Sequence, residues 1–106
     1  NVNIGMTAST VIEKYALDAV SSSATSTTVT LTNNTASSVS VQYILAAYTA
    51  DGQMVASSTV ASDLQSQKSI KLTVQYSAKD QVSWVSAFVL QAGTLQPLRA
   101  VWKKAL

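Results

Sequence analysis

Hydrophobic and polar residues alternate along most of the chain, in the period-two pattern that is typical of β-strands with one buried face. The pattern is clearest over residues 69–76, where Ile70, Leu72, Val74 and Tyr76 share one face and polar side chains occupy the other. The same alternation recurs about every ten residues, and it predicts seven strands. They cover residues 11–21, 27–32, 39–50, 53–59, 69–76, 82–91 and 94–102.

Asp51 and Gly52 stand between two apolar segments, residues 39–50 and residues 53–60. An Asp-Gly pair between alternating hydrophobics predicts a β-hairpin with a type I′ turn, because that turn needs positive φ angles, which glycine adopts easily. The segment before the turn is apolar on both faces from Tyr43 to Tyr48, as in a central or covered strand. The segment after the turn carries little charge and indicates an edge strand.

Regularly spaced strand signals without an amphipathic helix predict an all-β fold, an antiparallel β-sandwich of about seven strands. The chain has 106 residues, enough for one domain. We expect the sandwich to cover residues 11–106, preceded by residues 1–10 as a linker or edge strand. Pro97 places the last strand at an edge or a bulge. The expected core consists of Val29, Leu31, Val41, Tyr43, Leu45, Ile70, Leu72, Val74, Val85 and Phe88.

Several pieces of the sequence occur in a particular order. A Thr-rich segment ends in Asn-Asn-Thr, a long apolar segment runs into Ala-Asp-Gly-Gln-Met-Val, and Ala87-Phe88 and Pro97-Leu98 follow. This order resembles that of small immunoglobulin-like or fibronectin-III-like accessory domains of secreted and cell-surface proteins of Gram-positive bacteria. The resemblance covers about residues 27–98, although the Trp-Asp of that family is replaced by Leu90-Gln91.

The resemblance implies an immunoglobulin-like sandwich in an extracellular or cell-surface protein. It implies a non-catalytic accessory or spacer module that contacts neighbouring domains of a longer chain or another protein. Sandwiches of that family serve beside catalytic or adhesive partners, so the resemblance implies location more strongly than activity.

The composition excludes several kinds of chemistry. The chain has no His and no Cys, so a Ser-His-Asp triad, a thiolate metal site and a Cys nucleophile are excluded. Of its acids, Asp51, Asp63 and Asp80 fall in separate predicted turns, where Asp is expected for backbone reasons. We therefore expect no enzyme activity, no metal site and no cofactor.

Charge and hydropathy narrow the range of partners. Only 11% of the residues are charged, and the net charge of +2 comes from dispersed lysines and arginines. No basic stripe is interleaved with aromatic residues, so we expect no nucleic-acid partner. No stretch of eighteen apolar residues occurs, so we expect no transmembrane segment.

Aromatic residues provide the alternative function, a carbohydrate-binding module for cell-wall or plant polysaccharide. Flat aromatic side chains stack against the apolar face of a sugar ring, and the candidate ligand-binding residues are Trp84, Trp102 and Tyr48. The competing interpretation is that these side chains fill the core or its corners.

Two further features are open to more than one interpretation. Asn33-Asn34-Thr35 matches the N-glycosylation pattern, but it also matches a polar turn, which we favour. Residues 53–60 have no Lys and no Pro, so this predicted edge is unprotected. We expect it, or the terminal segment 94–102, to pair with a neighbouring domain or with a second copy as an edge-strand dimer.

Overall fold

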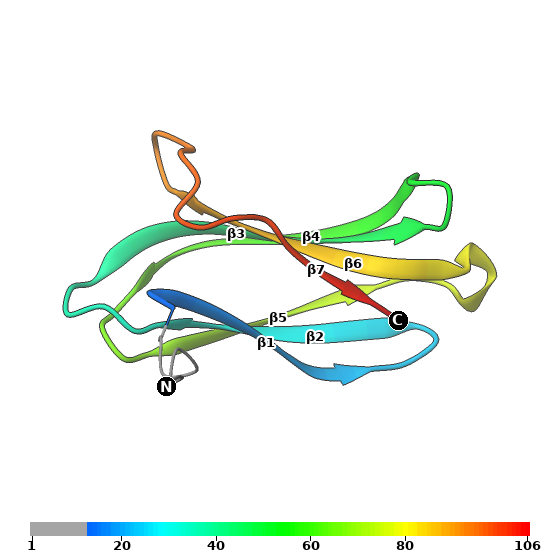
Figure 1. Cartoon of the computed structure of the whole chain (residues 1–106), viewed down its shortest axis with the longest axis horizontal. Helices are drawn as coiled ribbons and strands as arrows, with labels where there is room; N and C mark the ends of the chain where they lie inside the picture. Colours follow the sequence, from blue (N-terminus) through cyan, green and yellow to red (C-terminus); the bar gives the residue numbers. More distant parts are fainter. Residues whose placement is uncertain (1–12) are drawn as a thin grey trace, which may run out of the picture.

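The computed structural model describes residues 13–106. This part of the chain forms two antiparallel sheets packed face to face (Figure 1), which confirms the predicted all-β sandwich. The strand order is β1-β2-β5 in the three-stranded sheet and β4-β3-β6-β7 in the four-stranded sheet. The elements are β1 (Tyr15–Ser22), β2 (Ser26–Asn33), β3 (Val39–Thr49), β4 (Met54–Leu64), β5 (Ser69–Gln75), the 3-10 turn η2 (Ala78–Asp80), β6 (Val82–Gln91) and β7 (Trp102–Ala105).

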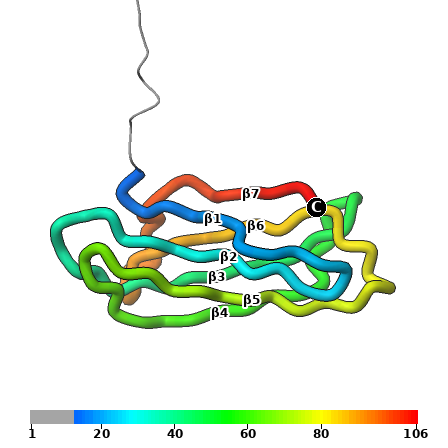
Figure 2. The backbone as a smooth tube through the Cα atoms, turned by 90° about the horizontal axis from the view of Figure 1, so that it is seen from below, coloured from blue at the N-terminus to red at the C-terminus, as the bar shows by residue number. Residues whose placement is uncertain are grey.

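The two sheets are joined along both sides of the sandwich. On one side β4 lies beside β5 (Figure 2), and the Ser58 hydroxyl of β4 donates to the Thr73 carbonyl of β5 at 2.8 Å. On the other side, the Arg99 guanidinium donates to the Tyr15 carbonyl at 2.9 Å. Arg99 also lies 3.3 Å from the Glu13 carboxylate. These contacts hold the connection before β7 against the start of β1.

The core lies between the sheets and is made by alternate residues of each strand. The Tyr43 hydroxyl of β3 crosses the core and donates to the Val29 carbonyl of β2 at 2.8 Å. Burial raises the pKa of the Tyr43 phenol above its ordinary value, so the side chain is neutral. Its hydrogen bond links the two sheets across the core. Other buried members of the core are Leu17, Leu31, Val41, Leu45, Ala47, Leu64, Val74, Tyr76, Val85, Ala87 and Val89.

The prediction that Phe88 belongs to the core is wrong. Val85, Ala87 and Val89 of β6 are buried between the sheets, so Phe88 points to the opposite face and is only half-buried. A strand that is apolar on both faces gives no sequence signal for which parity faces the core. Ile70 and Leu72 pack against the core as predicted, but they are half-buried because β5 is an edge strand.

The predicted last strand is also wrong. Residues 94–101 form a connection whose ladder contact is a single bridge between Leu90 and Pro97, and β7 begins at Trp102. Gly93 and Leu95 have φ angles of 89° and 59°. Positive φ angles are incompatible with an extended strand, and they curl the chain away from β6 before it returns.

The β3–β4 hairpin forms as predicted, but its turn differs. Among Ala50, Asp51 and Gly52 only Gly52 has a positive φ, of 89°. The Gly52 amide donates to the Thr49 carbonyl at 3.0 Å, and the Thr49 amide donates to the Gln53 carbonyl at 2.9 Å. This is a three-residue loop with glycine in the left-handed region, rather than the two-residue type I′ turn.

The remaining differences concern element boundaries. The predicted strand 11–21 is present as β1, which begins at Tyr15, and the predicted linker 1–10 lies outside the described residues. The predicted edge strand 53–59 extends to Leu64 as β4. Apart from a single 3-10 turn, residues 13–106 contain no helix, and hence none of a length and hydropathy that would span a membrane.

Candidate functional site: the outer face of the four-stranded sheet

Apolar side chains cover the outer face of the four-stranded sheet along its two central strands. They come from alternate positions of β3 and β6, which pair with Ile44 opposite Phe88 and Tyr48 opposite Trp84. None of these side chains belongs to the core cluster between the sheets, and most are half-buried. We call this surface the outer apolar face, and its residues are Ile44, Ala46, Tyr48, Trp84, Phe88 and Leu90.

The sequence folds this way because β3 and β6 are apolar at both parities. One parity fills the core, and the other is left on the outside, where an ordinary antiparallel sheet carries polar residues. The edge strands frame the face with polar side chains, Thr59 on β4 and Lys103 on β7. An apolar strip with a polar rim is the arrangement found at protein contact surfaces.

A cross-strand row of three side chains stands on this face. The rings of Tyr48 and Trp84 are stacked, with 5.6 Å between their centroids and 14° between their planes. The Lys103 ammonium lies 4.2 Å from the centroid of the Trp84 ring. Because β6 lies between β3 and β7, Tyr48 and Lys103 come from the strands on either side of Trp84, and both contact its ring.

The structure brings together two of the three aromatic residues that the sequence suggested for sugar binding. Tyr48 and Trp84 meet on the outer apolar face, whereas Trp102 lies opposite Ala87 in the β6–β7 register. Ala87 faces the core, so Trp102 does too, and it packs against the core cluster. Sugar stacking would need an exposed Trp102 ring, but strand parity turns this candidate towards the core.

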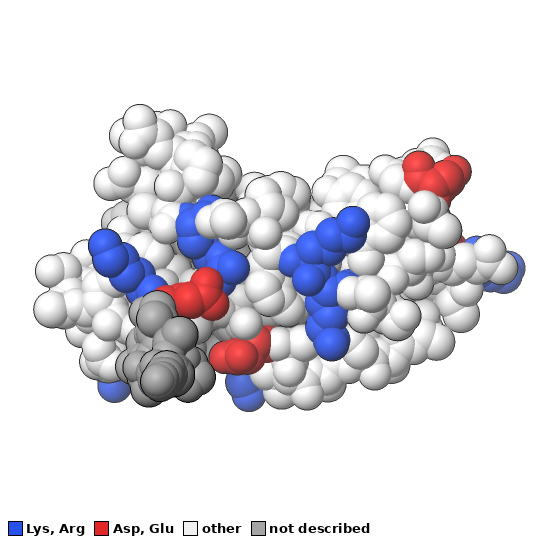
Figure 3. All heavy atoms as spheres, in the orientation of Figure 1, with Lys and Arg blue, Asp and Glu red and all other residues white. Residues whose placement is uncertain are grey.

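The shape of the molecule leaves this face recessed between two raised ends. In Figure 1 the connection after β6 and the β3–β4 hairpin both rise above the four-stranded sheet. In Figure 3 the upper outline of the molecule dips between the same two segments, and most of the surface drawn is uncharged. The four-stranded sheet therefore lies lower than the two segments that rise at its ends.

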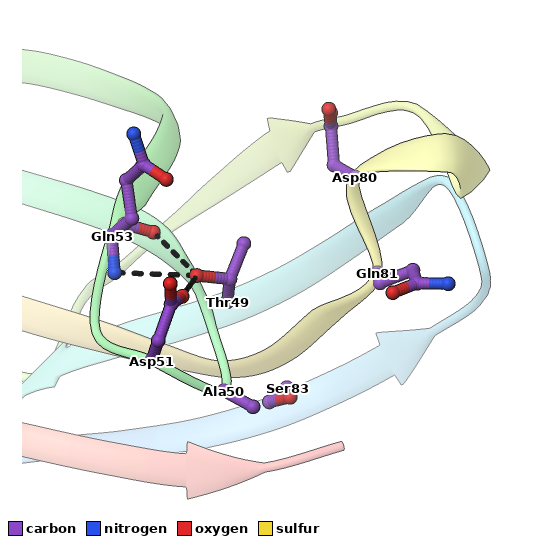
Figure 4. Close-up of a pocket in the computed structure, with 7 residues that line it drawn as sticks. All are labelled: Thr49, Ala50, Asp51, Gln53, Asp80, Gln81 and Ser83. Atoms are coloured by element: carbon purple, nitrogen blue, oxygen red, sulfur yellow. Dashed lines mark hydrogen bonds between the residues drawn. The ribbon is translucent and has the colours of Figure 1, made fainter.

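A polar pocket of about 440 Å³ lies at one end of the sandwich, between the β3–β4 hairpin and the connection from β5 to β6 (Figure 4). Thr49 donates a hydrogen bond to the Asp51 carboxylate, and this bond holds the pKa of Asp51 below its ordinary value. The Asp80 carboxylate accepts from the Ser77 amide at 2.9 Å as part of a capping box. The pocket is lined by Thr49, Ala50, Asp51, Gln53, Asp80, Gln81 and Ser83.

Both carboxylates of the pocket are thus used to hold their own turns. A lowered pKa keeps Asp51 ionised, which is unsuited to a general acid at neutral pH. In the described part of the chain, no three acids come together in a group that could hold a metal ion. The pocket supplies hydrogen-bonding groups, and both of its carboxylates are already bonded within their own turns.

Asn33 holds the polar turn that the sequence favoured at this position, although the sequence pattern did not reveal that its side chain is buried. It is fully buried, and its amide nitrogen donates to the Ser37 carbonyl at 2.9 Å and the Leu64 carbonyl at 3.0 Å. Its amide oxygen accepts from the backbone and hydroxyl of Thr35. Because both N–H groups are used and buried, Asn33 in the folded domain is a turn-building residue rather than an accessible acceptor for a glycan.

Comparisons with known proteins bear on the fold. No family model matches the chain, and no curated protein matches it. A solved structure to which the chain is similar is that of a beta-glucuronidase from glycoside hydrolase family 2, with a TM-score of 0.50 and 14% sequence identity. The match covers 87% of this chain and 11% of the beta-glucuronidase chain. The chain therefore shares a β-sandwich fold with one part of a much longer protein.

Proposed function

We propose that this domain is a non-catalytic accessory module of an extracellular bacterial protein, and that its outer apolar face docks against a neighbouring domain. The observation that carries the proposal is the apolar strip on β3 and β6, which lies on the solvent side of the sheet. Five of its six residues are half-buried and Ala46 is buried, and partly exposed apolar surface of this kind is stabilised when a partner covers it.

The lack of acid–base machinery supports a non-catalytic role. The chain has no His and no Cys, and the two carboxylates in the pocket are committed to local turns. Buried Tyr43 is neutral and hydrogen-bonded to a backbone carbonyl between the sheets, away from solvent. None of these groups is placed to activate a nucleophile.

The arrangement of the aromatic row favours a protein partner over a sugar. A sugar ring stacks on a free aromatic face, but the Trp84 ring is already in contact with the Tyr48 ring and the Lys103 ammonium. The outer apolar face also offers the hydrocarbon of Ile44 and Phe88, which packs well against side chains of another domain.

Two further points support an accessory role in an extracellular protein. The similar beta-glucuronidase structure contains this fold as 11% of its chain, so the fold occurs there within a much longer polypeptide. The low charge and abundant Ser and Thr, together with the family resemblance over residues 27–98, support an extracellular or cell-surface location.

Radical footprinting tests the proposal, because hydroxyl radicals label solvent-accessible aromatic and sulfur side chains. The 106-residue chain and the natural polypeptide that contains it would be labelled in parallel. We expect Tyr48, Trp84 and Phe88 to be protected in the longer polypeptide, while Trp102, on the core side, keeps its labelling. Equal labelling of the three outer residues in both samples would overturn the proposed contact.

The carbohydrate-binding alternative rests on Tyr48 and on the polar pocket that begins at the next residue. A polysaccharide pull-down with Tyr48→Ala, Trp84→Ala and Trp102→Ala variants distinguishes it from the leading proposal. Binding that is lost in the Tyr48 and Trp84 variants but kept in the Trp102 variant would favour the sugar site. Absence of binding would leave the protein contact as the remaining proposal.

A further inference from the structure

The sandwich has four edge strands, and three of them are protected against pairing with another chain. β1 contains a register shift between Ala19 and Ser21 and carries Asp18. β7 is four residues long and carries Lys103 and Lys104. Bulges, short length and charges are the usual protections of a sheet edge.

β5, the third protected edge, is blocked by its neighbour in the other sheet. The Ser58 hydroxyl of β4 donates to the Thr73 carbonyl of β5 at 2.8 Å, which occupies an acceptor of that edge. β5 also carries Lys71 on its solvent face. A second chain that added to β5 would have to displace the Ser58 contact and approach this charge.

β4 shares the contact with β5 through the Ser58 side chain, but its own backbone edge is less protected over most of its length. It is 11 residues long, and its single charged residue is Asp63, next to its end. In the described part of the chain, the backbone groups of residues 54–62 make no hydrogen bonds other than those of the β3–β4 ladder. Its one irregularity is a bulge near the hairpin, between Met54 and Ala56.

We infer that β4 pairs with β4 of a second copy of this chain, antiparallel and about a twofold axis. The full-overlap register places Thr59 opposite its own symmetry mate, since Thr59 is the midpoint of Met54–Leu64. In this register Asp63 of each chain lies opposite Val55 of the other, so no like charges face each other. The pairing joins the two four-stranded sheets into one, with the lysine-bearing β7 strands at its two far ends.

A second copy fits this edge better than a charged ligand or peptide does. The solvent-facing side chains of residues 57–61 are Ser57, Thr59 and Ala61, which are small and uncharged. They offer little for side-chain recognition, so the attraction comes from the backbone ladder. Backbone pairing is satisfied equally well by an identical strand, and it is weak enough to be reversible.

Sedimentation equilibrium of the wild-type chain up to millimolar concentration tests the inference. We expect a dimer whose population rises with concentration. Thr59→Lys places two ammonium groups opposite each other across the axis and should weaken dimerisation by about fivefold or more. Gln75→Lys is the matched control, since it adds the same charge on the exposed face of β5 and should leave dimerisation unchanged.

Cross-linking tests the register without relying on a charge. The chain has no cysteine, so Thr59→Cys introduces a unique thiol. We expect it to form an intermolecular disulfide on mild oxidation, whereas Gln75→Cys should not. Circular dichroism and thermal melts of each variant confirm that the fold is retained.

Two results would overturn the inference. The first is a wild-type chain that stays monomeric at millimolar concentration. The second is a dimer that Thr59→Lys leaves intact. If that dimer is also lost on Phe88→Ser, the contact lies on the outer apolar face instead.

Discussion

The solvent-facing sides of the two sheets differ in kind. On the three-stranded sheet, the central strand β2 turns Thr28, Thr30 and Thr32 outward. On the four-stranded sheet, the central strands β3 and β6 turn outward the aromatic and aliphatic residues of the outer apolar face. The inner sides of both sheets are alike, since alternate Val and Leu residues fill the core from each.

The difference indicates which face needs a partner. On the threonine face two pairs of hydroxyls are hydrogen-bonded across neighbouring strands: the Thr28 and Thr73 hydroxyls are 2.7 Å apart, and the Thr32 and Ser69 hydroxyls are 2.8 Å apart. The outer apolar face is stabilised when another surface covers it, so we assign the proposed docking contact to the four-stranded sheet.

The largest expected effect tests whether the inner sides are equivalent. Leu31 of β2 and Leu45 of β3 are both fully buried, one in each sheet. Truncation of either to Ala should lower the free energy of unfolding by about 2–5 kcal/mol, because each leaves a cavity in the same core. Urea unfolding of the two variants measures this. A large cost in one sheet and almost none in the other would contradict a shared core.

A smaller effect is expected on the outside of the four-stranded sheet. Phe88 is half-buried and lies outside the core cluster, so Phe88→Ala should lower the free energy of unfolding by about 1–2 kcal/mol. The free energy of unfolding of Phe88→Ala is compared with that of Leu31→Ala in the same series of urea denaturation experiments. If Phe88→Ala costs as much as Leu31→Ala, Phe88 is a core residue and the outer face is not the free surface described above.

Period-two alternation was sufficient to predict the face of a residue where one side of the strand is polar. In β2 the outward threonines and inward Val29 and Leu31 follow the pattern, and both inward residues are buried as predicted. In β6 both sides are apolar, so the pattern identifies a central strand without saying whether Ala87 or Phe88 faces the core. That choice is made by the partner sheet, which lies far away in sequence.

The candidate site could be predicted only in part, because its contacts depend on how the strands pair. Tyr48 and Trp84 were suggested as exposed aromatics, and the β3–β6 register brings them together. Lys103 was not linked to Trp84, since their contact depends on the β6–β7 register and on where β7 begins. That start was misplaced because Leu95 adopts a positive φ, which its residue type gives no reason to expect.

The aromatic row provides a third prediction. Lys103→Ala removes the ammonium from the Trp84 ring and should lower the free energy of unfolding by about 0.5–1 kcal/mol, with a change in the fluorescence of Trp84. Lys104→Ala is the control, because Lys104 is the adjacent residue at the opposite parity of β7 and is exposed. If Lys103→Ala and Lys104→Ala change the free energy of unfolding and the fluorescence equally, the Lys103 ammonium does not stay on the Trp84 ring in solution.

The smallest effect is expected on the threonine face, where two neighbouring threonines should respond differently. The Thr28 hydroxyl is bonded to Thr73, so Thr28→Val should lower the free energy of unfolding by about 0.5–1.5 kcal/mol.

The Thr30 hydroxyl oxygen is buried and has no hydrogen-bond partner, so Thr30→Val replaces an unsatisfied group by a methyl of similar shape. This second substitution should be neutral or slightly stabilising, since Val favours strands as much as Thr does. Thermal and urea unfolding of the Thr28→Val and Thr30→Val variants, in the same buffer and at the same protein concentration, measures the difference between their free energies of unfolding. If Thr30→Val destabilises the domain as much as Thr28→Val, the Thr30 hydroxyl is hydrogen-bonded in solution. The outer face of the three-stranded sheet would then be a continuous hydroxyl network, rather than two bonded pairs with a gap between them.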